Sequence, residues 1–79
     1  MTVCYNKLWK LLIDRKMKRK ELAALSGVSN STLAKMGRNV NVSTEMLAKI
    51  CNALQVDIGD IMEMIPNDNK EKEGKENGR

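Results

Sequence analysis

The stretch that decides the fold is KELAALSGVSNSTLAKM, from Lys20 to Met36. It holds two short helical patterns separated by a glycine, and the second pattern begins with four polar residues in a row. Gly27 follows the last turn of the first pattern, where a residue with positive φ commonly ends a helix. Ser29 is well suited to cap a second helix that runs to about Met36. The stretch therefore predicts two short helices joined by a tight turn.

The apolar residues of this stretch predict how the two helices pack. We expect Leu22 and Leu25 to point inward from the first helix, and Leu33 and Met36 to anchor the second. Two helices that cross steeply and closely need a small residue at the crossing, which Ala23 supplies. The second helix then keeps an exposed front of hydrogen-bonding groups and one cation, a surface suited to reading base edges in a DNA major groove. The candidate base-reading residues are Ser29, Asn30, Ser31, Thr32 and Lys35.

Apolar residues at helical spacing predict three further helices around this pair. The first begins near residue 5, ends near residue 15 or 16, and buries Tyr5, Leu8, Trp9, Leu12 and Ile13. A fourth begins after Ser43 and buries Leu47, Ile50, Cys51 and Leu54. A fifth begins after Asp57 and has one apolar face made of Ile58, Ile61, Met62 and Ile65. The one strand-like segment, TVCY at residues 2–5, has no evident partner strand, so we expect an all-α domain of five helices over residues 1–65.

The charge of the chain is concentrated in one part of it. Residues 66–79 have no apolar residue after the proline, and their four cations balance four carboxylates, so we expect a disordered polar tail there. The net charge of +4 therefore lies in residues 1–65, where RKMKRK at residues 15–20 holds five cations in six residues. Such a cluster indicates a polyanion as partner, although a solvated basic turn has the same composition.

The composition offers little catalytic chemistry. The 79 residues suffice for one small domain, and they include no histidine, the commonest general base and metal ligand. Cys4 and Cys51 match no zinc or thioredoxin spacing, and the first residues do not read as a signal peptide, so we expect two reduced cysteines in a cytoplasmic protein. No apolar run is long enough to span a membrane. We expect no enzyme activity, no metal, no cofactor and no small-molecule ligand.

The sequence resembles the lambda-repressor-like helix-turn-helix family, the Xre and Cro type, over residues 5–65. The resemblance is carried by LWKLLID, KELAALSGVSNSTLAKM, VSTEMLAKICNAL and DIGDIME, and it is strongest with the compact single-domain regulators common in bacterial prophages and mobile elements. It implies a repressor in the bacterial cytoplasm, associated with the nucleoid, that binds double-stranded DNA. In that family the second helix begins on the phosphate backbone and the third enters the major groove.

The resemblance also implies which residues contact phosphate. By position it gives Arg19 and Lys20 the start of the second helix, and it gives Arg38, Asn39, Asn41 and Ser43 a backbone clamp before the fourth helix. With the neighbouring cations Lys16 and Lys18, these residues form the expected phosphate-binding set.

The sequence departs from the family pattern at two places. Lys18 occupies the position that caps the second helix, where the family usually has serine or threonine. A lysine cannot accept the capping hydrogen bond, so the extra charge comes at a cost of about 1 kcal/mol. After the third helix the sequence reads MGRN where the family usually has Glu-x-Gly, so the contacts of Arg38 and Asn39 do not follow from the resemblance.

Two hypotheses about protein partners follow. Family members usually bind two-fold operators as dimers, and we expect a weak homodimer through Ile58, Ile61, Met62 and Ile65, with TVCY pairing with its symmetry mate as a further contribution. The alternative is that the same apolar face binds another protein, as in an antitoxin or adaptor. A salt-dependent affinity for duplex DNA would favour the regulator, and a stable heterocomplex without DNA would favour the alternative. An RNA-binding role lacks an aromatic stacking surface.

Overall fold

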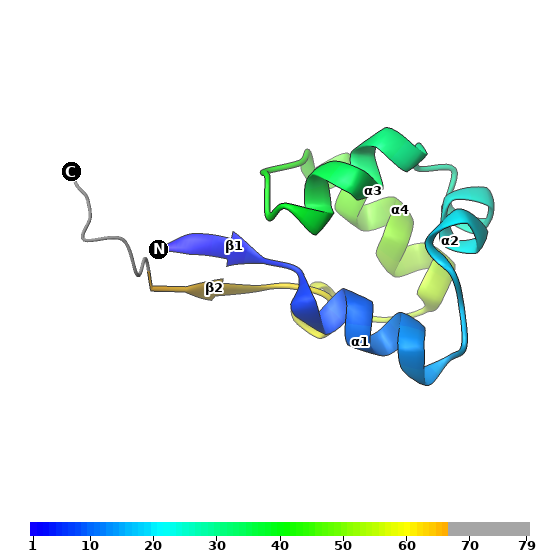
Figure 1. Cartoon of the computed structure of the whole chain (residues 1–79), viewed down its shortest axis with the longest axis horizontal. Coiled ribbons are helices and arrows are strands. Elements are labelled where there is room, and N and C mark those ends of the chain that lie inside the picture. Colours follow the sequence, from blue (N-terminus) through cyan, green and yellow to red (C-terminus); the bar gives the residue numbers. More distant parts are fainter. Residues whose placement is uncertain (67–79) are drawn as a thin grey trace.

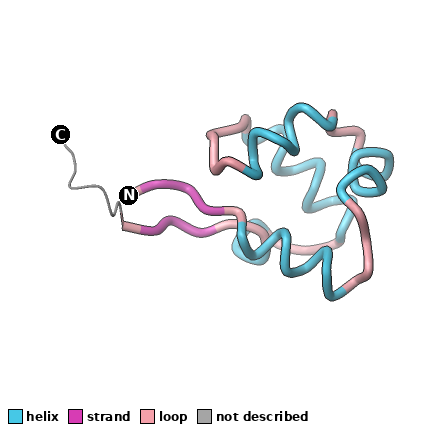
Figure 2. Tube along the Cα trace, viewed as in Figure 1, coloured by secondary structure: helices cyan, strands magenta, loops and turns pink. Residues whose placement is uncertain are grey.

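The computed structural model describes residues 1–66, which form four α-helices, one 3₁₀ turn and a two-stranded antiparallel ribbon. The helices pack into one body and the ribbon projects from it (Figure 1), with short loops between the elements (Figure 2). The expected tail, residues 66–79, lies outside the described part except for its first residue, Pro66. The elements are β1 (Thr2–Cys4), α1 (Asn6–Asp14), α2 (Arg19–Ser26), α3 (Asn30–Gly37), α4 (Thr44–Leu54), η1 (Ile58–Asp60) and β2 (Glu63–Ile65).

The predicted fifth helix is wrong: it is replaced by η1 and β2. Asp57 does cap this segment, since its Oδ1 accepts a hydrogen bond of 2.7 Å from the backbone N–H of Ile58. The helical conformation lasts one turn, and residues 63–65 then pair with β1, with Val3 opposite Met64. The physical reason is that TVCY has a partner after all. Strand pairing satisfies backbone groups of residues 63–65, and β-branched Ile65 at the end of this segment favours a strand.

The core lies between the four helices and the base of the ribbon, and it is built mainly from the residues that helical periodicity selects. Tyr5, Leu8, Leu22, Leu33, Met36, Ile50 and Leu54 are each at most 2% exposed. Ile61, expected on a helical face, is 0% exposed and belongs to the same core. Leu12, Val28 and Leu47 complete it.

Two residues expected inside are on the surface. Ile13 is 73% exposed and Leu25 is 58% exposed. In α2 the inward face runs through Leu22, Ala23 and Ser26, and Leu25 lies about a quarter turn to one side of it. In α1 the inward face centres on Leu8 and Leu12, and Ile13 lies beyond its edge. Cys51, expected in the buried stripe of α4, is half-buried.

The helix ends follow the signals in the sequence. Gly27 ends α2 with φ of 82°, as predicted for the turn. Ser29 caps α3 by accepting from the N–H of Thr32, and Ser43 caps α4 by accepting from the N–H of Met46. Both cysteines are free, and no helix in the described part of the chain is long and apolar enough to cross a membrane.

Candidate nucleic-acid interface

The outward side of α3 carries the predicted base-reading residues. Leu33 and Met36 hold the helix against the core, which turns Asn30, Ser31 and Lys35 to solvent and leaves Thr32 half-buried. The sequence therefore sets which side of α3 is exposed, because its only large apolar residues lie three apart on the opposite side.

Three hydroxyl groups at the start of α3 are already engaged with one another. Ser29 Oγ lies 3.1 Å from Ser31 Oγ and 3.0 Å from Thr32 Oγ1, and it also accepts a 3.2 Å hydrogen bond from the backbone N–H of Thr32. This network fixes the first turn of the helix. Asn30 and Lys35, on the same exposed side, make no side-chain hydrogen bond within residues 1–66, so their polar groups are directed only to solvent.

The predicted phosphate-binding residues come from the turn before α2, the start of α2, and the loop between α3 and α4. Lys16 follows the C-cap of α1 and has a left-handed conformation with φ of 55°. Lys18 is the N-cap of α2, where its backbone N–H donates to Glu21 Oε1 at 2.7 Å while its side chain makes no capping bond, as expected. The exposed members of the set are Lys16, Lys18, Arg19, Lys20, Arg38, Asn41 and Ser43.

Asn39 has a structural role, which its place among the expected phosphate-binding residues does not indicate. It has φ of 57°, a conformation that asparagine tolerates better than most residues. Its Oδ1 accepts a 3.2 Å hydrogen bond from the backbone N–H of Tyr5, and the Tyr5 hydroxyl donates to the carbonyl of Val40 at 3.2 Å. The start of α1 thus holds the α3–α4 loop in place. Burial raises the pKa of the Tyr5 hydroxyl, so that group stays a neutral donor.

Arg19 joins three helices at the start of α2. Its guanidinium carbon lies 4.0 Å from the centroid of the Trp9 ring in α1, a cation–π geometry, and its nitrogens lie against Gly37 at the end of α3. The helical pattern of residues 5–13 indicates only a core position for Trp9. Trp9 and Arg19 are ten positions apart, and Arg19 and Gly37 are eighteen apart, so the periodicity of a single helix does not predict their contacts.

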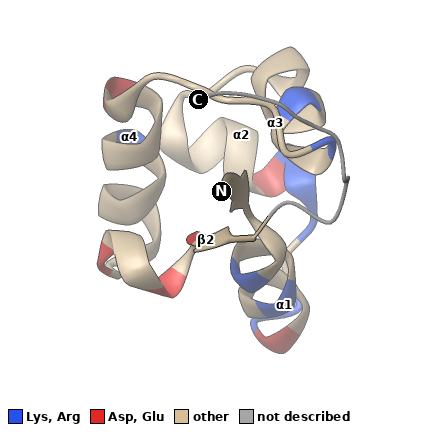
Figure 3. Ribbon diagram, turned by 90° about the vertical axis from the view of Figure 1, so that its left-hand side faces the viewer, with Lys and Arg blue, Asp and Glu red and all other residues tan. Residues whose placement is uncertain are grey.

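The charged residues are divided between two sides of the molecule. Nine of the ten cations in residues 1–66 precede Asn41, while four of the six carboxylates follow it, so the side of α1 to α3 is positive and the side of α4 and η1 is negative. Figure 3 shows most of the basic residues around α1 and α3, where some acidic residues also lie, and further acidic residues near the ends of α4. Within the described residues the one ion pair joins Lys49 to Glu45 at 3.9 Å, on α4. The cations around α2 and α3 therefore make no ion pair within residues 1–66.

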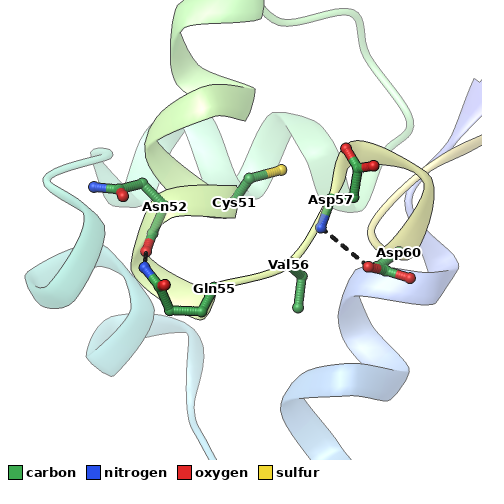
Figure 4. A pocket seen from close by; sticks show the side chains of 6 residues that line it. All are labelled: Cys51, Asn52, Gln55, Val56, Asp57 and Asp60. Carbon is green, nitrogen blue, oxygen red and sulfur yellow. Dashed lines mark hydrogen bonds between the residues drawn. The ribbon is translucent and has the colours of Figure 1, made fainter.

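One hollow of the surface lies on the acidic side, between α4 and η1 (Figure 4). Burial and the charges of Asp57 and Asp60 raise the pKa of the Cys51 thiol, which keeps it protonated and weakly nucleophilic. Residues 1–66 hold no group of three metal-ligating side chains. The hollow is lined by Cys51, Asn52, Gln55, Val56, Asp57 and Asp60, and it offers no cation to a nucleic acid.

The four residues expected to form a dimer contact do not share one face. Ile61 is buried in the core, and Ile58 in η1 is 41% exposed. Met62 and Ile65 are half-buried, before and within β2. Met64, which was not selected from the sequence, is 51% exposed on the ribbon.

The arrangement of α2 and α3 around Gly27 is a helix-turn-helix, with exposed cations beside it and a polar outward side on α3. Residues 7–67 match the family model of the Cro/C1-type helix-turn-helix DNA-binding domain. The chain belongs to this Cro/C1-type family. The Xre/Cro resemblance of the sequence is thereby confirmed, and the Cro/C1-type domain accounts for most of the chain.

A solved structure is similar to this Cro/C1-type chain over most of both lengths. It is the crystal structure of the transcriptional regulator VanUg, form II, which is 57% identical, with a TM-score of 0.79. The match covers 84% of this chain and 88% of that one. No curated protein matches the chain.

Proposed function

We propose that this chain is a sequence-specific transcriptional regulator that acts as a repressor, with α3 in the major groove of double-stranded DNA. The exposed front of α3 carries the proposal, because it places Asn30 and Lys35 outward between unpaired cations of α2 and of the α3–α4 loop. The similarity to a transcriptional regulator at 57% identity supports the regulatory role. The chemistry supports it as well, since asparagine can bond adenine and lysine can bond guanine at their major-groove edges.

The positions of the residues separate those that read bases from those that contact phosphate. Asn30, Ser31, Thr32 and Lys35 on α3 read bases, with Ser29 holding the helix start. The phosphate contacts come from the rim, and they fix the register of α3 without carrying sequence information. The rim consists of Lys16, Lys18, Arg19, Lys20, Arg38, Asn39, Asn41 and Ser43.

The experiment begins with selection of bound duplexes from a random pool, followed by affinity measurements on the selected site and on a scrambled one. Asn30→Ala and Lys35→Ala are expected to cost about 1–3 kcal/mol on the selected site only. Lys20→Ala is expected to weaken both duplexes alike and to reduce the magnitude of the salt slope by about 1.

Lys49→Ala is the matched control, because it removes the same charge from α4, where the lysine pairs with Glu45. It should leave both affinities close to those of the wild type. Equal losses on both duplexes for Asn30→Ala and Lys35→Ala would assign these residues to the backbone. A chain that selects no common sequence would contradict the proposal as a whole.

We also propose that the functional unit on DNA is a weak homodimer. A single α3 spans only a few base pairs, and two-fold pairing matches half-sites about one helical turn apart. The segment from Ile58 to Ile65 supplies the contact, since Ile58 and Met64 are exposed and the outer edge of β2 is unpaired within the described chain. The alternative role as an antitoxin or adaptor depended on the continuous apolar face of a fifth helix, and no such face forms.

A further inference from the structure

Gly37 raises a question that backbone conformation does not answer. It is the last residue of α3, and its φ is not positive, whereas the left-handed residue that follows the helix is Asn39. Any residue with a side chain could adopt the backbone conformation of Gly37. What distinguishes the position is space: a Cβ added there would lie 3.0 Å from Nη1 and 3.4 Å from Nη2 of Arg19. The guanidinium thus occupies the volume that a side chain would take.

A second neighbour of the guanidinium is an aromatic ring. The carbon at the centre of the Arg19 guanidinium lies 4.0 Å from the centroid of the Trp9 ring, within the range of a cation–π contact. Trp9 is half-buried and packs on the core, so the ring is a fixed surface rather than a mobile one. Arg19 itself remains exposed and has no carboxylate within ion-pair distance among residues 1–66. The guanidinium is held in position without being neutralised.

We propose that Trp9 and Gly37 are positioning residues that hold the Arg19 guanidinium ready for a DNA phosphate. The inference rests on the proposed function, because it assigns to Arg19 the phosphate contact at the start of α2. A free arginine side chain has many rotamers and must give up most of them to bind a phosphate in a defined geometry. A side chain that is already stacked on a ring of one helix, in space that a glycine of another helix leaves open, loses less freedom on binding. This preorganisation increases affinity.

The contact of Arg19 with Trp9 and Gly37 also joins three helices at one phosphate-binding group. Trp9 lies in α1, Arg19 begins α2 and Gly37 ends α3. A DNA phosphate bound by this guanidinium therefore fixes the position of the DNA backbone relative to α3, the helix proposed to read bases. A lysine at residue 19 would keep the charge but would lack the planar group that stacks on the ring.

The experiment compares duplex affinity and thermal stability for paired variants. Trp9→Leu removes the aromatic face and Trp9→Phe retains one, so affinity should fall about threefold for Trp9→Leu and remain near that of the wild type for Trp9→Phe. Gly37→Ala should displace the guanidinium and lower affinity by a similar factor. It should not lower the melting temperature, because alanine favours a helix over glycine. Gly59→Ala is the matched control, since an added Cβ there contacts nothing within 4 Å.

The Arg19→Ala background distinguishes positioning from a general structural effect. Arg19→Ala alone should weaken binding about tenfold and reduce the magnitude of the salt slope by about 1. In that background Trp9→Leu and Gly37→Ala should have no further effect on affinity. Equal effects in both backgrounds would overturn the positioning role, and so would wild-type affinity for Gly37→Ala. If Arg19→Ala left the affinity and the salt slope unchanged, Arg19 would not contact phosphate. If the wild-type chain did not bind duplex DNA at all, the proposed function itself would be wrong.

Discussion

At the scale of single residues, Tyr5 fastens the start of α1 to the loop that follows α3. Its side chain is 1% exposed, its hydroxyl donates to the carbonyl of Val40, and its backbone N–H donates to Asn39. Tyr5→Phe keeps the ring in the core and removes the hydroxyl hydrogen bond. We expect the free energy of unfolding to fall by about 1 kcal/mol at neutral pH, measured by chemical denaturation.

The same residue predicts a difference at alkaline pH. Because burial raises the pKa of the Tyr5 hydroxyl, the folded chain retains a proton that the unfolded chain releases near pH 10. The stability that the neutral hydroxyl contributes is therefore complete below about pH 10 and is lost as the pH rises towards the folded pKa. Tyr5→Phe lacks this loss, so the stability gap between the two chains should narrow from pH 8 to pH 11. A gap that stays constant over this range would contradict the role of Tyr5.

At the scale of elements, α2 has a positively charged residue, Lys18, at its N-cap in place of a residue that can cap the helix. Glu21 bonds the backbone N–H of Lys18, which is half of a capping box, and Lys18 cannot supply the other half. Lys18→Ser should complete the box and raise the free energy of unfolding by about 1 kcal/mol, or the melting temperature by about 4–8 °C. It should also weaken binding to all duplexes and reduce the magnitude of the salt slope by about 1. A more stable variant with an unchanged salt slope would show that Lys18 does not contact phosphate.

At the scale of the whole molecule, the ribbon leaves apolar side chains and an unpaired strand edge outside the helical body. We expect an interface formed by the ribbon alone to bury an area near or below roughly 1,200 Å², the lower end for stable complexes. The dimer should therefore form only at high concentration or on DNA. Sedimentation over a concentration series should show this association, and Met64→Glu should abolish it. Leu25→Glu places the same charge on another exposed apolar residue and should not. A chain that stays monomeric throughout and binds DNA one-to-one would contradict the dimer.

Much of the helical part could be predicted because local patterns agree with the final packing. Ser29 and Ser43 cap helices, Gly27 makes the turn, and Leu33 with Met36 orients α3. Each of these features depends on residues within about one or two turns of each other. The exposed front of α3 follows from the same short-range pattern, and the base-reading role assigned to it stays a prediction.

The segment after α4 could not be predicted in the same way. Ile58, Ile61 and Ile65 fit a helical face and also fit a strand, since β-branched residues favour strands and short apolar runs are ambiguous. The choice depended on whether β1, some sixty residues earlier, was available as a partner. The local pattern of residues 58–65 does not indicate whether a distant strand pairs with them.

The amino-acid sequence by itself determined four helices, the turn between α2 and α3, the exposed side of α3 and the position of the basic cluster. These depend on helical periodicity, capping chemistry and the conformational freedom of glycine, all of which act over a few residues. Only the tertiary structure decided the β1–β2 ribbon, the burial of Ile61, the bonding of Asn39 to Tyr5, and the placement of the Arg19 guanidinium against Trp9 and Gly37. Each of these joins elements distant in sequence, and such contacts form where the packed helices bring donors, rings and open volume together.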